Sequence, residues 1–178
     1  MKVYSICFTK NGFKILEKLS KIINGDNLLD ADNLPSGSNL PNADNLLNAS
    51  NLSNANNLPN KNQLKFNATS KFYLSKRIYD DLILDEALQR PMNSDFRRAN
   101  LREFTQEAWQ EADAIIYIGA TGIALRSIAK YIDKKDKDPA VVVIDEKGRY
   151  VIPLLSGHIG GANDLSLYLS EKLGSQAV

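Results

Sequence analysis

Short apolar stretches recur along the chain with the length and composition of β-strands. They lie at Lys2–Phe8, Lys71–Leu74, Ala114–Ile118, Ala140–Ile144 and Tyr150–Leu154. The stretches at 114–118 and 140–144 contain no charged residue, which is typical of strands buried on both faces of a parallel sheet. The pattern therefore predicts one sheet at the centre of the molecule.

Apolar residues recur at helical spacing between and after these strands. The expected helical positions are Phe13, Leu16, Leu19, Ile22 and Ile23, then Leu101, Phe104, Ala108 and Trp109, then Ile123, Leu125, Ile128, Ala129 and Ile132, and finally the segment Asp164–Leu173. Asn100–Glu103 has the form of a capping box, a helix-start signal. This alternation predicts an α/β fold, with a mostly parallel sheet flanked by helices in a Rossmann-like three-layer arrangement. We expect residues 1–178 to form a single domain, although 75–95 shows no clear pattern.

An Asn-Leu dipeptide recurs every six residues, beginning at positions 27, 33, 39, 45, 51 and 57. These hexads occupy a predicted insertion at 24–67 that interrupts the domain. A repeat of this kind could stack into a small solenoid. However, one leucine per hexad buries little surface, and Pro35, Pro41 and Pro59 remove backbone donors. We therefore expect a disordered low-complexity loop whose removal leaves the domain intact.

Composition and charge narrow the class of function. The net charge is +1 and the calculated pI is about 7.7, so nothing favours nucleic acid or an acidic membrane as a partner. Cys7 is the only cysteine and His158 the only histidine, which leaves too few ligands for a typical metal site and rules out a disulfide within the chain. Cys7 is expected to be a buried apolar residue. The apolar stretches are too short to span a bilayer, and we expect a cytoplasmic protein.

Three loops connect a predicted strand to a predicted helix: Thr9–Gly12, Gly119–Gly122 and Ser156–Asn163. In an open α/β sheet such loops meet at the carboxyl edge, where helix N-termini favour anions. We therefore expect all three loops to surround one pocket. The Gly119–Gly122 loop lacks the third glycine and downstream acid of a dinucleotide site, and no Walker sequence occurs, so NAD and ATP are poor candidates.

The loop at 156–163 carries the densest set of candidate residues. Gly157, Gly160 and Gly161 permit close backbone approach, and Asn163 is expected to cap the following helix. His158 is a candidate general base or oxyanion donor, or a residue that only holds the loop by bonding a backbone carbonyl. Ser156 is a weaker candidate nucleophile, because Ser-Gly-His is too local for a triad.

Arg126 follows the Gly119–Gly122 loop by one helical turn and is a candidate ligand for a carboxylate. Lys130, Lys134, Lys135 and Lys137 extend a basic run, for which a solvated face is the ordinary interpretation. A carboxylate-rich ligand is the alternative interpretation of the same run.

Three segments together resemble a known family: Ile118–Arg126, Asp136–Asp145 and Val151–Asn163 are similar to the N-terminal domain of CbiG-type cobalamin biosynthesis proteins. The similarity is close from Ala112 to Val178 and looser over the first strand. The resemblance implies membership of the cobalt-precorrin-5A hydrolases, which open the δ-lactone of a ring-contracted corrin intermediate and release acetaldehyde. It also implies that relatives continue into a Thr-rich loop, a linker and a C-terminal domain, so that this chain is a fragment or needs a partner chain.

The resemblance assigns roles to the candidate residues. It implies a catalytic His158 and substrate binding by the motif positions Gly119, Gly122, Arg126, Gly157, Gly160, Gly161 and Asn163. The cobalt would arrive with the tetrapyrrole substrate, so no protein cofactor is expected. One alternative is a non-catalytic module that binds a corrinoid or docks on another domain. Another is an unrelated α/β domain that binds a small phosphorylated ligand.

Overall fold

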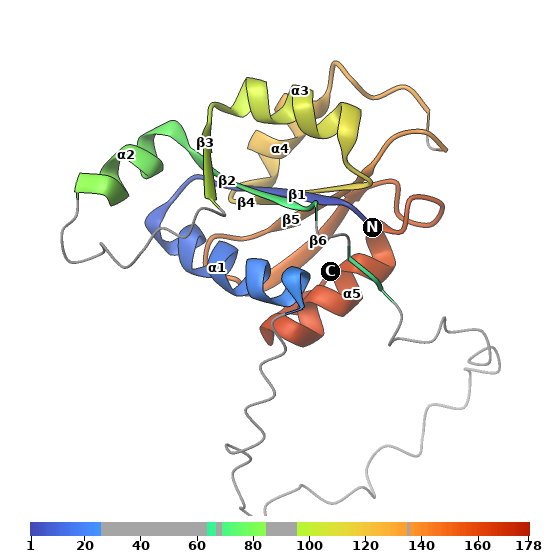
Figure 1. The fold of residues 1–178 in the computed structure, drawn as a ribbon. Coiled ribbons are helices and arrows are strands. Elements are labelled where there is room, and N and C mark those ends of the chain that lie inside the picture. The colour runs from blue at the N-terminus through green and yellow to red at the C-terminus, as the bar shows by residue number, and fades with distance from the viewer. Residues whose placement is uncertain (26–63, 67–68, 85–95, 135) are drawn as a thin grey trace, which may run out of the picture. The chain divides into compact units, whose positions relative to one another are not determined.

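A computed structural model describes residues 1–25, 64–66, 69–84, 96–134 and 136–178. Within these ranges the strands are β1 Val3–Cys7, β2 Lys71–Ser75, β3 Phe96–Ala99, β4 Ala114–Ile118, β5 Ala140–Ile144, β6 Tyr150–Leu155 and β7 Gln176–Ala177. The helices are α1 Lys10–Asn24, α2 Lys76–Leu84, α3 Leu101–Glu111, α4 Thr121–Ile128 and α5 Ala162–Leu173. The described residues thus form seven strands in one sheet flanked by five helices, as the α/β prediction required (Figure 1).

The strands lie in the order β3-β2-β1-β4-β5-β6-β7. The first five are mutually parallel, as the apolar character of β4 and β5 indicated. β6 pairs antiparallel to β5 because a tight hairpin joins them. In this hairpin the Asp145 carboxylate accepts backbone N–H bonds from Lys147, Arg149 and Tyr150, and Gly148 takes a φ of 67°. The Asp145–Gly148 turn thus reverses the chain direction in β6.

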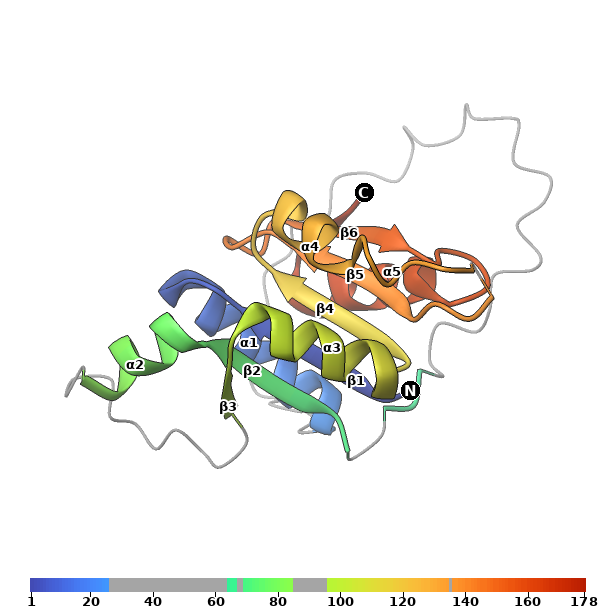
Figure 2. The same ribbon diagram turned by 90° about the horizontal axis from the view of Figure 1, so that it is seen from above.

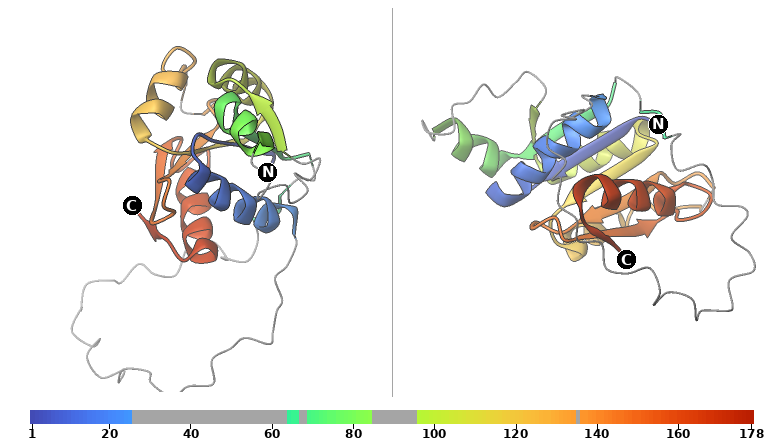
Figure 3. Two further views of the ribbon diagram at one scale, coloured as in Figure 1. Left: turned by 90° about the vertical axis from the view of Figure 1, so that its left-hand side faces the viewer. Right: turned by 90° about the horizontal axis from the view of Figure 1, so that it is seen from below.

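Helices lie on both faces of the sheet (Figure 3), and each face carries its own apolar core. On one face, α1 and α5 contribute Leu16, Leu19, Leu165 and Leu169, and α2 adds its own apolar residues. On the other face, α3 and α4 pack against a different set of strand residues, so that the fold has three layers. Cys7 is buried, and burial raises the pKa of its thiol to about 12. It is the small apolar core residue that the sequence indicated.

Side-chain caps set the starts of two helices. The start of α3 was predicted, whereas α1 begins at Lys10, within the predicted Thr9–Gly12 loop. The Thr9 hydroxyl accepts a bond from the Gly12 N–H at the start of α1, and the Asn100 side chain accepts one from the Glu103 N–H, 2.9 Å away, at the start of α3. These bonds satisfy N–H groups that have no partner within a helix. None of the helices in the described ranges is long and apolar enough to cross a membrane.

Both ends of the predicted insertion belong to the folded domain. Asn24 is the last residue of α1, and Leu64 and Phe66 pack against the core. The Phe66 ring contacts that of Tyr168 in α5, with centroids 5.5 Å apart, and the amino terminus donates to the backbone carbonyl of Lys65. Asn24 and residues 64–66 therefore belong to the folded domain, and the hexads of the predicted 24–67 insertion lie outside the described residues.

Replacing residues 26–63 with a Gly/Ser linker of about ten residues is expected to preserve cooperative unfolding. Loop closure costs only about 0.6 kcal/mol for each doubling of length, so the shorter loop should be neutral or slightly stabilising. Urea unfolding followed by circular dichroism measures this. Extending the deletion through Phe66 is the matched comparison, since it removes two residues that contact the core. Loss of cooperativity in the shorter deletion would show that the hexads are part of the packed domain.

Candidate functional site

The carboxyl edge of the sheet has a topological switch point between β1 and β4. These strands are neighbours, but the chain leaves β1 toward β2 and leaves β4 toward β5. Ligands of doubly wound sheets bind at such a point. At Gly119 the backbone N–H donates to Ile144 at 2.8 Å, and a Cβ would lie 3.1 Å from the Phe8 ring. Glycine thus permits the close approach of the two loops.

The start of α4 leaves part of this edge open to an anion. Its N-cap, Ala120, provides no side-chain bond, and the first turn contains no acidic residue. A Cβ added at Gly122 would meet no atom within 4 Å. Arg126 is exposed, and no ion pair of its guanidinium occurs in the described part of the chain. Exposed N–H groups and a positive charge here suit a carboxylate.

The Ser156–Asn163 loop lies at the opposite edge of the sheet. Because β6 is antiparallel to β5, Leu155 at the end of β6 pairs with Val141 near the start of β5. The Ser156 hydroxyl then donates to the backbone carbonyl of Asp138, which precedes β5, at 3.0 Å. In Figure 1 this loop lies on the side of the amino terminus, away from the start of α1. The expectation that three loops surround one pocket is therefore wrong.

The two groups of candidate residues are separated by the length of the central strands. The four residue steps of β5 span about 13 Å at roughly 3.3 Å per residue. Gly119, Gly122 and Arg126 stand at the carboxyl edge, while His158 and the other loop residues stand at the amino edge. A small ligand therefore cannot contact both groups.

The amino-edge loop closes on itself through backbone bonds. Ala162 N–H donates to Ser156 at 3.2 Å, and Asn163 N–H donates to Gly157 at 3.0 Å. Ser156 has a φ of 56°, a left-handed conformation that costs a non-glycine residue free energy and is common at functional sites. A Cβ on Gly160 would lie 2.5 Å from the Ser156 Cβ and 2.8 Å from its carbonyl oxygen. The loop is thus compact, and this packing requires glycine at position 160.

His158 and its neighbour Ile159 project from this loop into solvent, and Ile159 is 66% exposed. Within the described residues the His158 imidazole makes no hydrogen bond to the loop. The Ser156 hydroxyl bonds to Asp138, and no bond to His158 activates it as a nucleophile.

The expected cap of α5 by Asn163 is not formed. The N-cap is Gly161, with a φ of 82° and no side-chain bond, and Asn163 lies in the first turn. Its amide packs instead over Gly157, where an added Cβ would lie 2.7 Å from the Asn163 Oδ1. Asp164 lies in the first turn, beside the positive end of the helix dipole.

A separate charged cluster at the amino edge is paired within itself. The Glu111 carboxylate accepts bonds from the Tyr4 hydroxyl and from the ammonium groups of Lys71 and Lys2. These bonds, that of Tyr4 most of all, lower the pKa of Glu111 to about 2. Lys71 also bonds Glu107 at 2.7 Å. This cluster joins β1, β2 and α3 and offers no free charge to a ligand.

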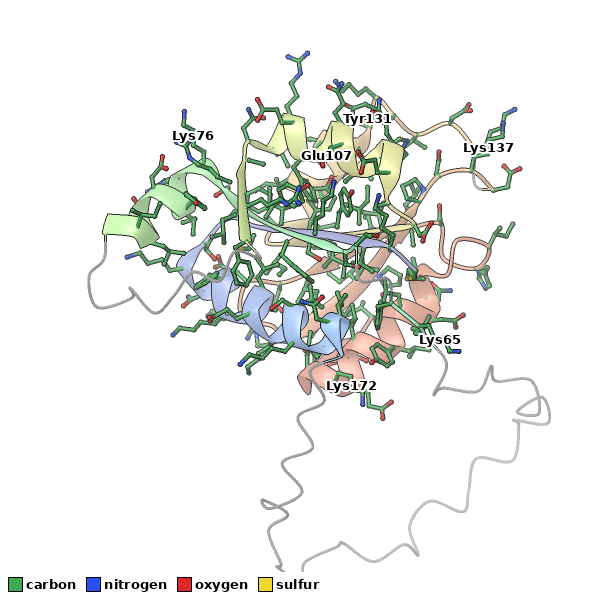
Figure 4. All side chains as sticks on the ribbon, in the orientation of Figure 1. Lys65, Lys76, Glu107, Tyr131, Lys137 and Lys172 are labelled. Carbon is green, nitrogen blue, oxygen red and sulfur yellow. The ribbon has the colours of Figure 1, made fainter. Side chains whose placement is uncertain are left out.

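The other ionisable candidates are dispersed. In the described ranges no three His, Cys, Asp or Glu side chains gather closely enough to hold a metal ion. Lys130, Lys134 and Lys137 of the basic run are exposed, as expected for a solvated face. Lys137 points away from the body of the domain in Figure 4.

Comparison with known proteins identifies the domain. Residues 103–178, from α3 to β7, match the family described as cobalamin synthesis G N-terminal. This part of the chain is of the CbiG N-terminal type. The matched region includes both the Gly119–Arg126 segment and the Ser156–Asn163 loop, whereas the loop after β1 precedes it.

Curated relatives of this CbiG domain are longer proteins. The cobalt-precorrin-5A hydrolase of Salmonella typhimurium is 55% identical over 73 residues, which cover 41% of this chain and 21% of the relative. The Priestia megaterium protein of the same name is 34% identical over 107 residues, covering 60% of this chain and 27% of the relative. The chain thus matches about a quarter or less of each of these relatives.

A solved structure supports the fold. The crystal structure of a cobalamin biosynthesis protein G homolog from Sulfolobus solfataricus aligns with 99% of this chain and 36% of its own, with a TM-score of 0.52 and 24% identity. At this identity the similarity supports the architecture alone.

Proposed function

We propose that this CbiG domain acts in cobalamin biosynthesis as the N-terminal part of a cobalt-precorrin-5A hydrolase. The reaction would open the δ-lactone of cobalt-precorrin-5A and release acetaldehyde. The observation that carries the proposal is the family match over 103–178, together with 55% identity to the Salmonella hydrolase over 73 residues. The remaining parts of such an enzyme would be supplied by additional chain, since the relatives are four to five times the matched length.

The chemistry is assigned to the amino-edge loop. In lactone opening, a water molecule activated by His158 attacks the carbonyl carbon, and the carbonyl oxygen becomes an oxyanion. The backbone N–H groups of Gly160 and Gly161 are candidate oxyanion donors, because those of Ala162 and Asn163 already bond within the loop. The N–H groups of Gly160 and Gly161 therefore support an anion position beside His158.

Acetaldehyde release is a retro-aldol step on the opened alcohol. A base removes the hydroxyl proton, the carbonyl of acetaldehyde forms as the C–C bond breaks, and the electron pair remains on the macrocycle, which then takes a proton. The exposed imidazole of His158 suits the proton removal. Gly157 and Asn163 would hold the shape of the loop, given the close contact between them. Cobalt is part of the substrate in this proposal.

The carboxyl-edge group, Gly119, Gly122 and Arg126, would bind substrate carboxylates at a second position. Arg126→Lys retains the charge but loses the bidentate fork, so affinity for a carboxylated cobalt corrinoid is expected to fall while thermal stability changes little. Visible-absorbance titration measures the affinity. Arg102→Lys, an exposed arginine on α3, is the control. Because the two edges are far apart, unchanged affinity in Arg126→Lys would confine the substrate to the amino edge.

A non-catalytic corrinoid-binding or docking module is the second candidate. It is favoured by the small share of each relative that the chain matches, 21% and 27%. One experiment distinguishes the two functions. A binding module would shift the visible absorbance spectrum of the corrinoid, but no longer chain that includes it would release acetaldehyde.

A further inference from the structure

The two faces of the sheet are covered unequally in the described residues. α1, α2 and α5 pack on one face, while only α3 and α4 pack on the other. Figure 2 looks onto this second face. At its border, Ile152 and Leu154 of β6 are only partly buried. Apolar side chains of β6 thus lack a helical layer on this face.

α4 and the residues just after it also carry exposed apolar side chains on the side away from α3. The opposite flank faces α3, since the Tyr131 ring stacks on Trp109 with centroids 5.8 Å apart. Leu125 lies in α4, Ala129 caps its C-terminal end one turn further along the same side, and Ile132 follows the turn after the helix. Leu125 is 50% and Ile132 42% exposed.

The sequence predicted a helix with apolar residues at Ile123, Leu125, Ile128, Ala129 and Ile132. In α4 the fold buries only Ala124 and Ile128. A helix that is apolar on several sides is normally enclosed by other structure. The flank of α4 and the adjacent face of β6 therefore form an apolar shelf, comprising Leu125, Ala129, Ile132, Ile152 and Leu154, that could seat one more helix.

Charge beside the shelf indicates the kind of partner. The segment from Thr121 to Ile132 contains Arg126 and Lys130 and no acidic residue. Two copies of this chain meeting through the shelf would bring like charges together, which disfavours a symmetric dimer. A helix with acidic residues beside its apolar stripe would complement the surface.

We propose that the shelf docks an amphipathic helix of a partner polypeptide, with an apolar stripe flanked by Asp or Glu. The relatives supply a reason for such a partner, because about three quarters of their length lies outside the match. The inference does not rest on the proposed hydrolase activity, and failure of one leaves the other standing.

The test uses the full chain and two synthetic helical peptides of about 18 residues. They share one leucine stripe, flanked by Glu in one peptide and by Lys in the other. The Glu peptide is expected to bind saturably by fluorescence anisotropy, and the Lys peptide at least about tenfold more weakly. Failure of the Glu peptide to bind, or equal binding of both peptides, would overturn the proposal.

Two variants localise the binding. Leu125→Glu and Leu154→Glu are expected to weaken binding of the Glu peptide at least about tenfold, because each places a carboxylate on the shelf. Leu167→Glu is the matched control, since Leu167 is 51% exposed on α5 at the other face. Circular dichroism checks that each variant is folded. Equal weakening by Leu167→Glu, or a dimer of the unmodified chain that Leu154→Glu dissociates, would contradict the assignment.

Discussion

His158→Gln is expected to slow acetaldehyde release by about 10²- to 10⁴-fold, the usual contribution of general acid–base catalysis. The measurement requires a chimera in which this chain replaces the matching region of the Salmonella hydrolase. Glutamine retains polarity and approximate size but cannot take a proton at neutral pH. The side chain is exposed, so the fold and corrinoid binding should be retained.

Lys147→Gln in the same chimera is the control, because Lys147 is an exposed residue of the hairpin at the other edge of the sheet. It should leave the rate unchanged. An unchanged rate in His158→Gln would remove this histidine from the mechanism. If both rates fell together, a general effect on the chimera would explain the loss.

Gly160→Ala is expected to destabilise the domain by about 1–3 kcal/mol, the typical cost of overpacking. The new methyl would overlap the Ser156 Cβ and its backbone carbonyl, at 2.5 and 2.8 Å. Backbone cannot rotate away as a flexible side chain can, so the loop must open and the bond from Ala162 to Ser156 must lengthen or break. Urea unfolding measures the stability, and corrinoid titration measures whether the altered loop still binds.

Gly122→Ala provides the matched control, since no atom lies within 4 Å of the added methyl and the residue is within α4. Alanine in a helix is favoured over glycine by roughly 0.5–1 kcal/mol, so this variant should be neutral or slightly more stable. Equal destabilisation by both variants would contradict the crowding at Gly160. A stable Gly160→Ala chain that still binds corrinoid would show that the loop tolerates rearrangement.

The elements that the sequence predicted are those with strong local signals. Continuous apolar runs identified β4 and β5, and the capping box at Asn100–Glu103 marked the start of α3. The cap at Thr9 was not identified, because Thr9–Gly12 was predicted to be a loop, whereas α1 begins at Lys10. β3 was missed because it is an edge strand of four residues, two of which are exposed arginines. Such a strand is specified by its pairing with β2, which a local pattern does not contain.

The sequence identified the residues of the candidate site but not their position in the fold. The residues of the Ser156–Asn163 loop were identified, yet the loop was assigned to the wrong edge. The signal was present in the Asp145–Gly148 hairpin, because two strands joined by a tight turn must be antiparallel. Carrying that reversal through to Leu155 would have placed His158 beside the start of β5. The exposed apolar side of α4 could not be foreseen, since spacing alone does not tell which sides of a helix are covered.

The burial of Cys7 makes the chain well suited to site-specific labelling. With a pKa near 12, only about one thiol in 10⁵ is ionised at pH 7, and the thiolate is the form that reacts with maleimides. A cysteine introduced at Ile159 or Leu125 would therefore take up a fluorophore or spin label without removal of Cys7. Probes at these two exposed positions would report separately on events at the amino-edge loop and on the flank of α4.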